Sequence, residues 1–380
     1  MEAVKLTWKQ AAAWRARRHH LDRRVPRSAL LDVVAELGGV HAQVLSSAEL
    51  SLWARIEDLE REAVADALWK DRSLVKTWAM RGTLHLLPSA EYRMWQAALG
   101  RARHYLAPSW ARGFGITVEE RDQLLEAVAS ALDGKLLTRA EVTAAIVNLT
   151  GSENLGEKVA GSWGSLLKPA SYRGELCFGP SAGQNVRFTR PDHWLRLGPP
   201  VDPEEAALEV TRRFLAAYGP ATREDYAHWW GLMSPAQAGK LISELGDEVE
   251  AVDVEGTSSW LLTADVGEVA AGGKSPSRAV ALLPAFDQYV IEASTHAERL
   301  MVGGTRDRIY RPQAWLTPVL IVGGMMHGVW KSERKGRRLE VAVEPFTPLP
   351  PWARRAVDQE AERLAAFLGG TLDLTVASGG

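Results

Sequence analysis

Two hydrogen-bonding side chains, His41 and Gln43, stand two residues apart and could hold one water molecule between them. In an extended segment both would point to one side while Ala42 points to the other. A water held by an imidazole and an amide is positioned for hydrolysis, and the imidazole can also accept its proton. The alternative is that both side chains bond to backbone groups left without partners at helix ends. The residues alone favour this structural role.

The common signatures of cofactor, metal and hydrolase sites are missing from the sequence. Residues 267–275 resemble a phosphate loop, but Glu268 stands where that loop requires glycine, and Pro276 interrupts the helix that should follow. The single cysteine, Cys177, excludes an internal disulfide and a cysteine-rich zinc site, and it is consistent with a reducing compartment. We therefore expect no cofactor and no metal.

The elements around His41 and Gln43 are expected to be helices. Residues 28–37 have a helical pattern that Gly38 and Gly39 end. Ser46 and Glu49 have the spacing of a capping box that begins the next helix. Residues 40–45 are therefore predicted to form a short loop between two helices.

An order of helices followed by a β-hairpin recurs along the chain. Residues 73–80 and 84–87 form the first expected hairpin, around Arg81-Gly82-Thr83. In the second instance Thr138 caps a helix, a recognition helix covers residues 157–170, and the strands follow. The third instance ends in strands at 249–254 and 258–263. This order is typical of winged helices.

The pattern predicts an α+β protein with three tandem winged-helix units and a C-terminal β-barrel. We expect winged helix 1 with the candidate catalytic loop at 1–118, winged helix 2 at 119–200 and winged helix 3 at 201–276. Residues 277–380 are rich in short strands with glycine and proline, and they end in a helix at 352–368.

Composition and charge permit DNA binding without requiring it. The 380 residues are 46% hydrophobic and 24% charged, which is typical of a folded protein. No apolar run approaches the roughly 20 residues of a membrane helix, and the first residues lack a signal peptide, so we expect a cytoplasmic protein. The net charge is −2, but residues 1–118 hold 18 Lys and Arg against 12 Asp and Glu. Such a basic part can follow a phosphate backbone.

Four segments together resemble the AlkZ/YcaQ family of bacterial DNA glycosylases, in this order and over nearly the whole chain. They read Val-His-Ala-Gln-Val from residue 40, Leu-Trp-Ala-Arg from residue 52, Lys-Thr-Trp-Ala-Met-Arg-Gly-Thr-Leu-His-Leu from residue 76 and Leu-Leu-Pro-Ala-Phe-Asp from residue 282. The resemblance implies a C-shaped arrangement around double-stranded DNA, no cofactor and a monomer. It also implies removal of purines alkylated at a ring nitrogen, including bulky adducts and, in some members, interstrand crosslinks.

The family's catalytic pattern is Gln-aliphatic-Gln, and here His41 replaces the first glutamine while Gln43 matches the second. A histidine at this place is found in members that resemble self-resistance enzymes of antibiotic producers. An N7-alkylguanine already carries positive charge and can leave without an acid, so a positioned water suffices. We expect Gln43 to accept a hydrogen bond from that water and His41 to hold it or take its proton. If His41 is the base, the rate should fall below about pH 6.5.

Further residues are candidates for DNA contact or for the surroundings of the site. Asp287 of the Phe-Asp segment is a possible neighbour of the active site, with a turn or cap role as the alternative. A rival function is a non-catalytic winged-helix regulator or an adduct-binding protein. The candidate DNA contacts are Arg81, Lys168, Arg173, Arg187, Arg299, Arg306 and Arg308.

Overall fold

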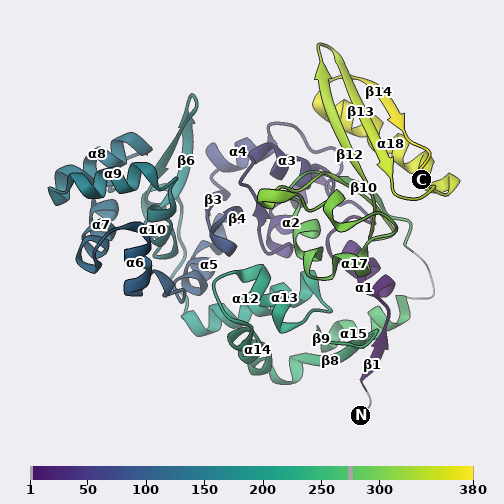
Figure 1. Cartoon of the computed structure of the whole chain (residues 1–380), viewed down its shortest axis with the longest axis horizontal. Helices are drawn as coiled ribbons and strands as arrows, with labels where there is room; N and C mark the ends of the chain where they lie inside the picture. The colour runs from purple at the N-terminus through teal and green to yellow at the C-terminus, as the bar shows by residue number, and fades with distance from the viewer. Residues whose placement is uncertain (1–2, 273–276, 380) are drawn as a thin grey trace. The chain divides into compact units, whose positions relative to one another are not determined.

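The computed structural model describes residues 3–272 and 277–379, which divide into two units that do not follow sequence order (Figure 1). Unit 1 consists of Met1–Ala63, Thr211–His228 and Ala238–Gly380. Unit 2 consists of Val64–Val210 and Trp229–Gln237. The last residues of the phosphate-loop-like run, and the expected boundary at 276, lie outside the described residues. The chain has a mixed α and β content, as expected.

The larger sheet of unit 1 stands where the sequence predicted a β-barrel. Its strands follow the order β10-β11-β12-β13-β14, with antiparallel neighbours except for the parallel pair β13 and β14. In the described residues β10 and β14 lie at opposite edges, so the sheet is open and no closed barrel forms. The strands are β10 (Val280–Leu283), β11 (Val319–Val322), β12 (Met325–Lys335), β13 (Arg338–Pro345) and β14 (Thr371–Val376).

Helix α18 (Pro351–Leu368) packs against β10 and β14 (Figure 1). Ala353, Val357, Ala361 and Leu364 recur every three or four residues and bury one face of the helix. Proline in the first turn and left-handed Gly369 after the last turn set its two ends. The sequence predicted this helix.

A second sheet of unit 1 joins the start of the chain to residues far along it. Strand β1 (Val4–Leu6) pairs in parallel with β8 (Val249–Val254), which pairs with β9 (Thr257–Leu262). The other elements of this unit are α1 (Trp8–Arg18), α2 (Leu30–Glu36), β2 (Val40–His41), α3 (Leu45–Trp53), α15 (Thr263–Ala271), α16 (Gln288–Glu292) and α17 (Ala297–Leu300). The boundaries between the units fall inside α4 (Ala63–Trp69), α12 (Pro203–Tyr218), α13 (Arg223–Trp230) and α14 (Pro235–Glu244).

The strands of unit 2 follow the order β4-β3-β6-β7-β5 around an aromatic core. Trp78 packs edge-on against Phe178 at a ring-centroid distance of 4.8 Å, and Phe178 contacts Phe188 at 4.9 Å. The strands are β3 (Leu74–Trp78), β4 (Leu84–Pro88), β5 (Leu137–Thr138), β6 (Cys177–Ala182) and β7 (Asn185–Thr189). The helices are α5 (Tyr92–Leu99), α6 (Pro108–Phe114), α7 (Val118–Ala131), α8 (Arg139–Thr150), α9 (Glu153–Gly161), α10 (Lys168–Tyr172) and α11 (Pro191–Trp194).

Local prediction succeeded at the hairpins and failed at two helix boundaries. Thr138 caps α8 as predicted, in a capping box with Glu141. The helix predicted at 157–170 is instead two helices, because Trp163 and Gly164 adopt left-handed conformations, with φ of +53° and +87°, that no α-helix can continue through. The capping box predicted at Ser46 is wrong, since α3 begins at Leu45 with no side-chain cap.

In the described residues, no helix is both long enough and apolar enough to cross a membrane.

Candidate active site

The segment that carries His41 begins at a reversal that two glycines make possible. Gly38 and Gly39 have φ of +67° and +95°, values that residues with a Cβ rarely adopt. Their amides donate to the carbonyls of Ala35 and Val34 at 3.0 and 2.9 Å and so close the last turn of α2. The predicted loop therefore starts as the two-residue strand β2, and His41 is its second residue.

The two candidate catalytic side chains have different environments. His41 is buried, with 5% of its surface exposed, between Val40 and Ala42, which are fully buried. Gln43 is exposed. The imidazole is therefore inside the protein, whereas the amide side chain of Gln43 is at the protein surface.

An aromatic stack connects His41 to the surface of unit 1. The ring of Phe286 is stacked on the imidazole of His41 with a tilt of 30° between the planes, and the ring centroids are 5.8 Å apart. Trp315 packs edge-on against Phe286 at 4.9 Å and 83°. Phe286 is half-buried and Trp315 is 56% exposed. We call His41, Phe286 and Trp315 the aromatic stack.

Asp287 fixes the backbone next to Phe286. Both its carboxylate oxygens accept hydrogen bonds of 2.8 Å from the guanidinium of Arg55, and neither side chain is exposed to solvent. The carboxylate also accepts from the amide of Tyr289, 2.9 Å away, and so caps α16. A bidentate charged pair has a defined geometry, so it joins the end of α3 to the start of α16. Asp287 thus has the cap role, and it contacts the site through the neighbouring Phe286.

Several residues in and beside the aromatic stack have left-handed backbone conformations, which are unfavourable for residues other than glycine. Phe286 has a φ of +62°, at the third position of a turn in which the amide of Asp287 donates to the carbonyl of Pro284 at 3.4 Å. Gln313 and Ala314, which precede Trp315, have φ of +61° and +57°. Such conformations cost of order 1 kcal/mol each and concentrate at ligand-binding sites.

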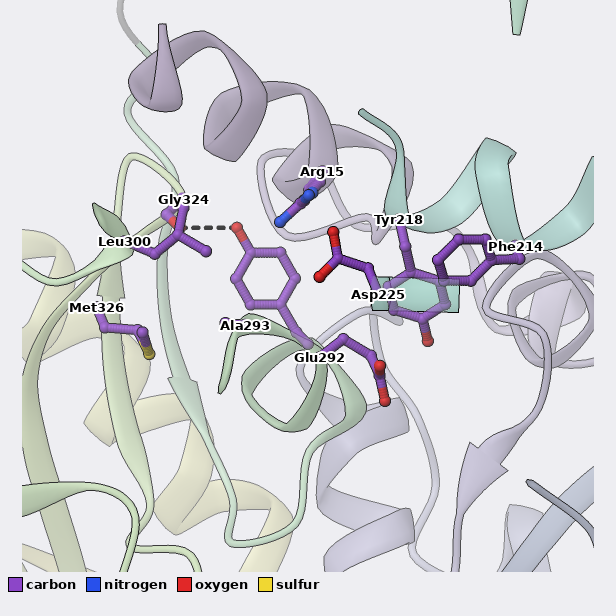
Figure 2. A pocket seen from close by; sticks show the side chains of 10 residues that line it. Arg15, Phe214, Tyr218, Asp225, Glu292, Ala293, Leu300, Gly324 and Met326 are labelled. Carbon is purple, nitrogen blue, oxygen red and sulfur yellow. Dashed lines mark hydrogen bonds between the residues drawn. The ribbon is translucent and has the colours of Figure 1, made fainter. Parts of the chain in front are cut away.

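A buried polar cluster supports α16 from within unit 1 (Figure 2). The hydroxyl of Tyr289 has one proton to donate, and the carbonyls of Gly324 and Ala12 lie within hydrogen-bond distance of it, at 2.7 and 3.2 Å. Arg15 and Asp225 point toward each other beside Tyr289 and line a cavity of about 20 Å³, enough for roughly one water. The cluster holds α16, and with it Asp287 and Phe286, against α1.

Charge and hydrogen bonding stabilise the ionised form of Asp225 in this cluster. Burial acts to raise the pKa of Asp225, but the hydrogen bond from His296 at 3.0 Å, with those from Thr295 and Thr222, outweighs it and holds the pKa well below its usual range. Burial likewise raises the pKa of the Tyr289 hydroxyl, so that it stays protonated as a donor.

Among the predicted DNA contacts, Arg81 and Lys168 lie together in unit 2. Both line one pocket with Gly82 and Tyr172. Arg81 has a left-handed φ of +55° in the turn between β3 and β4, and its guanidinium donates to the carbonyl of Trp229 at 2.9 Å. Lys168 is the first residue of α10, so its placement on a recognition helix continuous from residue 157 is wrong.

The other predicted contacts lie on separate elements, and most have protein partners. Arg173 pairs with Glu175 at 2.8 Å, and Arg187 donates to the carbonyl of Pro180 at 2.7 Å. Arg308 pairs with Glu344 at 2.8 Å. Residues 292–308 hold α17 and short 3₁₀ turns; Arg299 is exposed in α17, and Arg306 lies over the ring of Tyr310. Sequence reasoning missed Trp315, which no motif marks.

No three His, Cys, Asp or Glu side chains of residues 3–272 and 277–379 lie close enough together to hold a metal ion.

A mixed α and β chain in which a buried histidine stacks with aromatic rings that reach the surface is consistent with an enzyme that hydrolyses a bond next to a planar group, as DNA glycosylases do. Comparison with known proteins identifies the class. The family model for DNA glycosylases of the AlkZ-like type matches residues 34–367. The chain is 38% identical over 370 residues to an interstrand DNA cross-link repair glycosylase of Streptomyces sahachiroi, covering 96% of this chain and 98% of that one. The solved structure of the Streptomyces sahachiroi DNA glycosylase AlkZ superposes with a TM-score of 0.86 at 37% identity, covering 98% of this chain and 100% of that chain. The protein belongs to the AlkZ-like DNA glycosylase family, and it is a DNA glycosylase.

Proposed function

We propose that this glycosylase hydrolyses the N-glycosidic bond of alkylated purines, in particular bulky N7-guanine adducts, with a water held by His41 and Gln43. The observation that carries this proposal is the aromatic stack, which combines a buried imidazole with an exposed tryptophan. A base removed from the duplex is held by stacking on aromatic side chains. The imidazole lies at the inner end of the stack, and Trp315 offers an exposed ring for such a base at the outer end.

The chemistry needs little beyond a positioned water. Alkylation at N7 puts positive charge on the guanine, so the base leaves as a neutral molecule when the bond to C1′ breaks. Water then adds to the sugar cation, and its proton goes to His41. Gln43 orients the water by accepting its second hydrogen bond. Proton acceptance and orientation of this kind contribute about 100-fold or more.

Exposed aromatic area favours a large adduct over a methyl group. The open face of Trp315 offers an apolar, planar surface that a methylated base would leave uncovered. The relative from Streptomyces sahachiroi is named for interstrand cross-link repair. We extend this activity to the present chain, together with self-resistance in an antibiotic producer, action as a monomer and a cytoplasmic location on the nucleoid.

The order of elements supports the winged-helix architecture within this proposal. In unit 2, α7, β5, α8 and α9 precede the hairpin of β6 and β7, and β5 pairs with β7. In unit 1, Ala221 pairs with Trp260 of β9 ahead of the hairpin of β8 and β9. We retain winged helices at 1–118, 119–200 and 201–276 and a strand-rich part at 277–380, with double-stranded DNA as the ligand.

Single-turnover base release from a duplex with one bulky N7-guanine adduct tests the catalytic assignment. We expect His41→Ala and Gln43→Ala each to lower the rate about 100-fold. His41→Gln is the matched control, because it restores the family's amide at this position and should keep part of the rate. Thermal unfolding and lesion binding must stay near the parent's values. Parent rates in both alanine variants would overturn the assignment, and binding without turnover by the parent would favour an adduct-binding protein instead.

A further inference from the structure

Unit 2 contains a cationic pocket with aromatic walls that lies outside the aromatic stack. The pocket has a volume of about 270 Å³, close to the lower limit of roughly 300 Å³ for small-ligand sites. Its charged lining residues are Arg81 and Lys168, and no carboxylate lines it in the described residues. The aromatic lining residues are His104, Trp110, Phe114 and Tyr172.

The environment of the Lys168 ammonium is the main evidence that this pocket binds a ligand. The described residues offer its ammonium no hydrogen bond and no ion pair, although it is half-buried. Burial lowers the pKa of Lys168, because no nearby anion compensates for the loss of water. A lysine in this situation gains from an anion that enters the pocket.

Glycine keeps the floor of the pocket open. Gly82 has a φ of +64°, and a Cβ there would lie 3.1 Å from the hydroxyl of Tyr172 and 3.4 Å from Nζ of Lys168. The backbone turn that carries Arg81 therefore lies close to these two polar groups, and a side chain at residue 82 would crowd them. Arg81, Lys168 and Tyr172 all line this small volume, and each side chain carries hydrogen-bond donors.

The aromatic side chains form the other wall. Trp110 and Phe114 of α6 contact each other at 4.8 Å, and both are only half-buried. His104 lies 6.1 Å from the ring of Tyr172. Exposed rings beside phosphate-binding cations are the combination that holds single nucleotides in strand-binding proteins.

We infer that this pocket binds one nucleotide unit, with its phosphate at Lys168 and Arg81 and its base against Trp110 and Phe114. The unit is a nucleotide of a DNA strand, and a free mononucleotide shares its chemistry. The inference does not depend on the catalytic roles of His41 and Gln43, since it concerns strand binding by other residues.

Chemical labelling of Lys168 tests the site in the unaltered protein. An amine with a lowered pKa reacts readily with an acylating reagent at neutral pH, and peptide mass spectrometry reports each lysine separately. We expect a 5′-mononucleotide and a single-stranded oligonucleotide to protect Lys168 more strongly than inorganic phosphate does. Labelling of Lys168 that DNA leaves unchanged would overturn the inference. Equal protection by inorganic phosphate and by the nucleotide would also overturn it, because the base would then contribute nothing.

Variants separate the phosphate from the base. Lys168→Met should lower the slope of log affinity against log salt by about 0.7 for single strands. The matched control is Lys70→Met, since Lys70 already pairs with Asp66 at 2.7 Å and should leave the slope unchanged. Trp110→Ala should weaken binding at least about fivefold without changing the slope. If it unfolds the protein, Phe114→Ala carries the same test. An unchanged slope in Lys168→Met would refute the phosphate contact.

Discussion

At the scale of single residues, the contacts of Asp287 and Phe286 join parts of the chain that lie far apart in the sequence. His41, Gln43 and Asp287 were predicted from short patterns, and the cap role of Asp287 was one of the two alternatives. The pairing of Arg55 with Asp287 joins residues 232 apart, and no local pattern encodes such a contact. Trp315 follows two left-handed residues in a segment without periodicity, so no local pattern predicts its exposure.

Trp315 provides the sharpest test of substrate size. Trp315→Ala should slow base release from a bulky adduct by about tenfold or more while changing release of a methylated base less, because stacking on one ring contributes about 1–3 kcal/mol. Single-turnover rates on the two duplexes measure this. Trp315→Phe keeps a planar ring and should stay near the parent. Equal losses on both substrates would mean that Trp315 does not select for size.

The buried pair should dominate the stability of the loop behind the stack. Asp287→Asn leaves the guanidinium of Arg55 buried without its counter-ion. This change should lower the free energy of unfolding by about 3–5 kcal/mol. Urea titration gives the value. The double variant Arg55→Met with Asp287→Asn should lose less than the sum of the two single losses, since it leaves no uncompensated charge. Additive losses would show that the pair does not act as a unit.

At the scale of elements, prediction succeeded where the residues that determine a turn or a helix end lie within that same short segment. The hairpin β3–β4 and the capped helix α8 form where turn and capping residues placed them. Prediction failed where tertiary packing decides. Gly164 lies so close to Trp78 that a Cβ would come within 2.9 Å of its ring, and this close packing coincides with the break between α9 and α10. The sheet predicted to be a barrel is open. Closure would require its two edge strands to pair with each other, and no local sequence pattern encodes pairing between strands so far apart in the chain.

Thr138 tests the capping argument on its own. Thr138→Ala removes the side-chain acceptor for the amide of Glu141 and should lower the free energy of unfolding by about 1 kcal/mol. Thr138→Ser keeps the hydroxyl and should cost little. Denaturant titration of both variants makes the comparison. A loss as large in the serine variant would point to the methyl group rather than to the cap.

At the scale of the whole molecule, the division into units could not be predicted from sequence. Composition and element order suggested consecutive domains, whereas unit 1 draws on three separate stretches of chain. The polar cluster illustrates why. Its members Arg15, Asp225 and Tyr289 come from the three stretches, and they are ordinary polar residues until folding buries them together.

This cluster should make the free energy of unfolding depend on pH in the acid range. Because the folded pKa of Asp225 lies below that of the unfolded chain, its contribution is present above about pH 4. It is lost as the pH falls through the lower folded value. Asp225→Asn should therefore unfold more easily than the parent at pH 7, by about 2 kcal/mol, and the gap should narrow toward pH 2. Unfolding titrations at several pH values check this, and a gap that does not depend on pH would exclude the carboxylate as its source.

The discontinuous make-up of unit 1 also constrains the order of events during synthesis. A ribosome releases residues from the N-terminus onward, at about 5–20 residues per second. His41 emerges early, but Phe286, Asp287 and Trp315 emerge only after the whole of Val64–Val210. The nascent chain must therefore keep the segment around Arg55 soluble with its charge still hydrated while unit 2 folds in between. Enzymatic competence is consequently a property of the finished polypeptide, and a prematurely ended product would retain the nucleotide pocket of unit 2 without the aromatic stack.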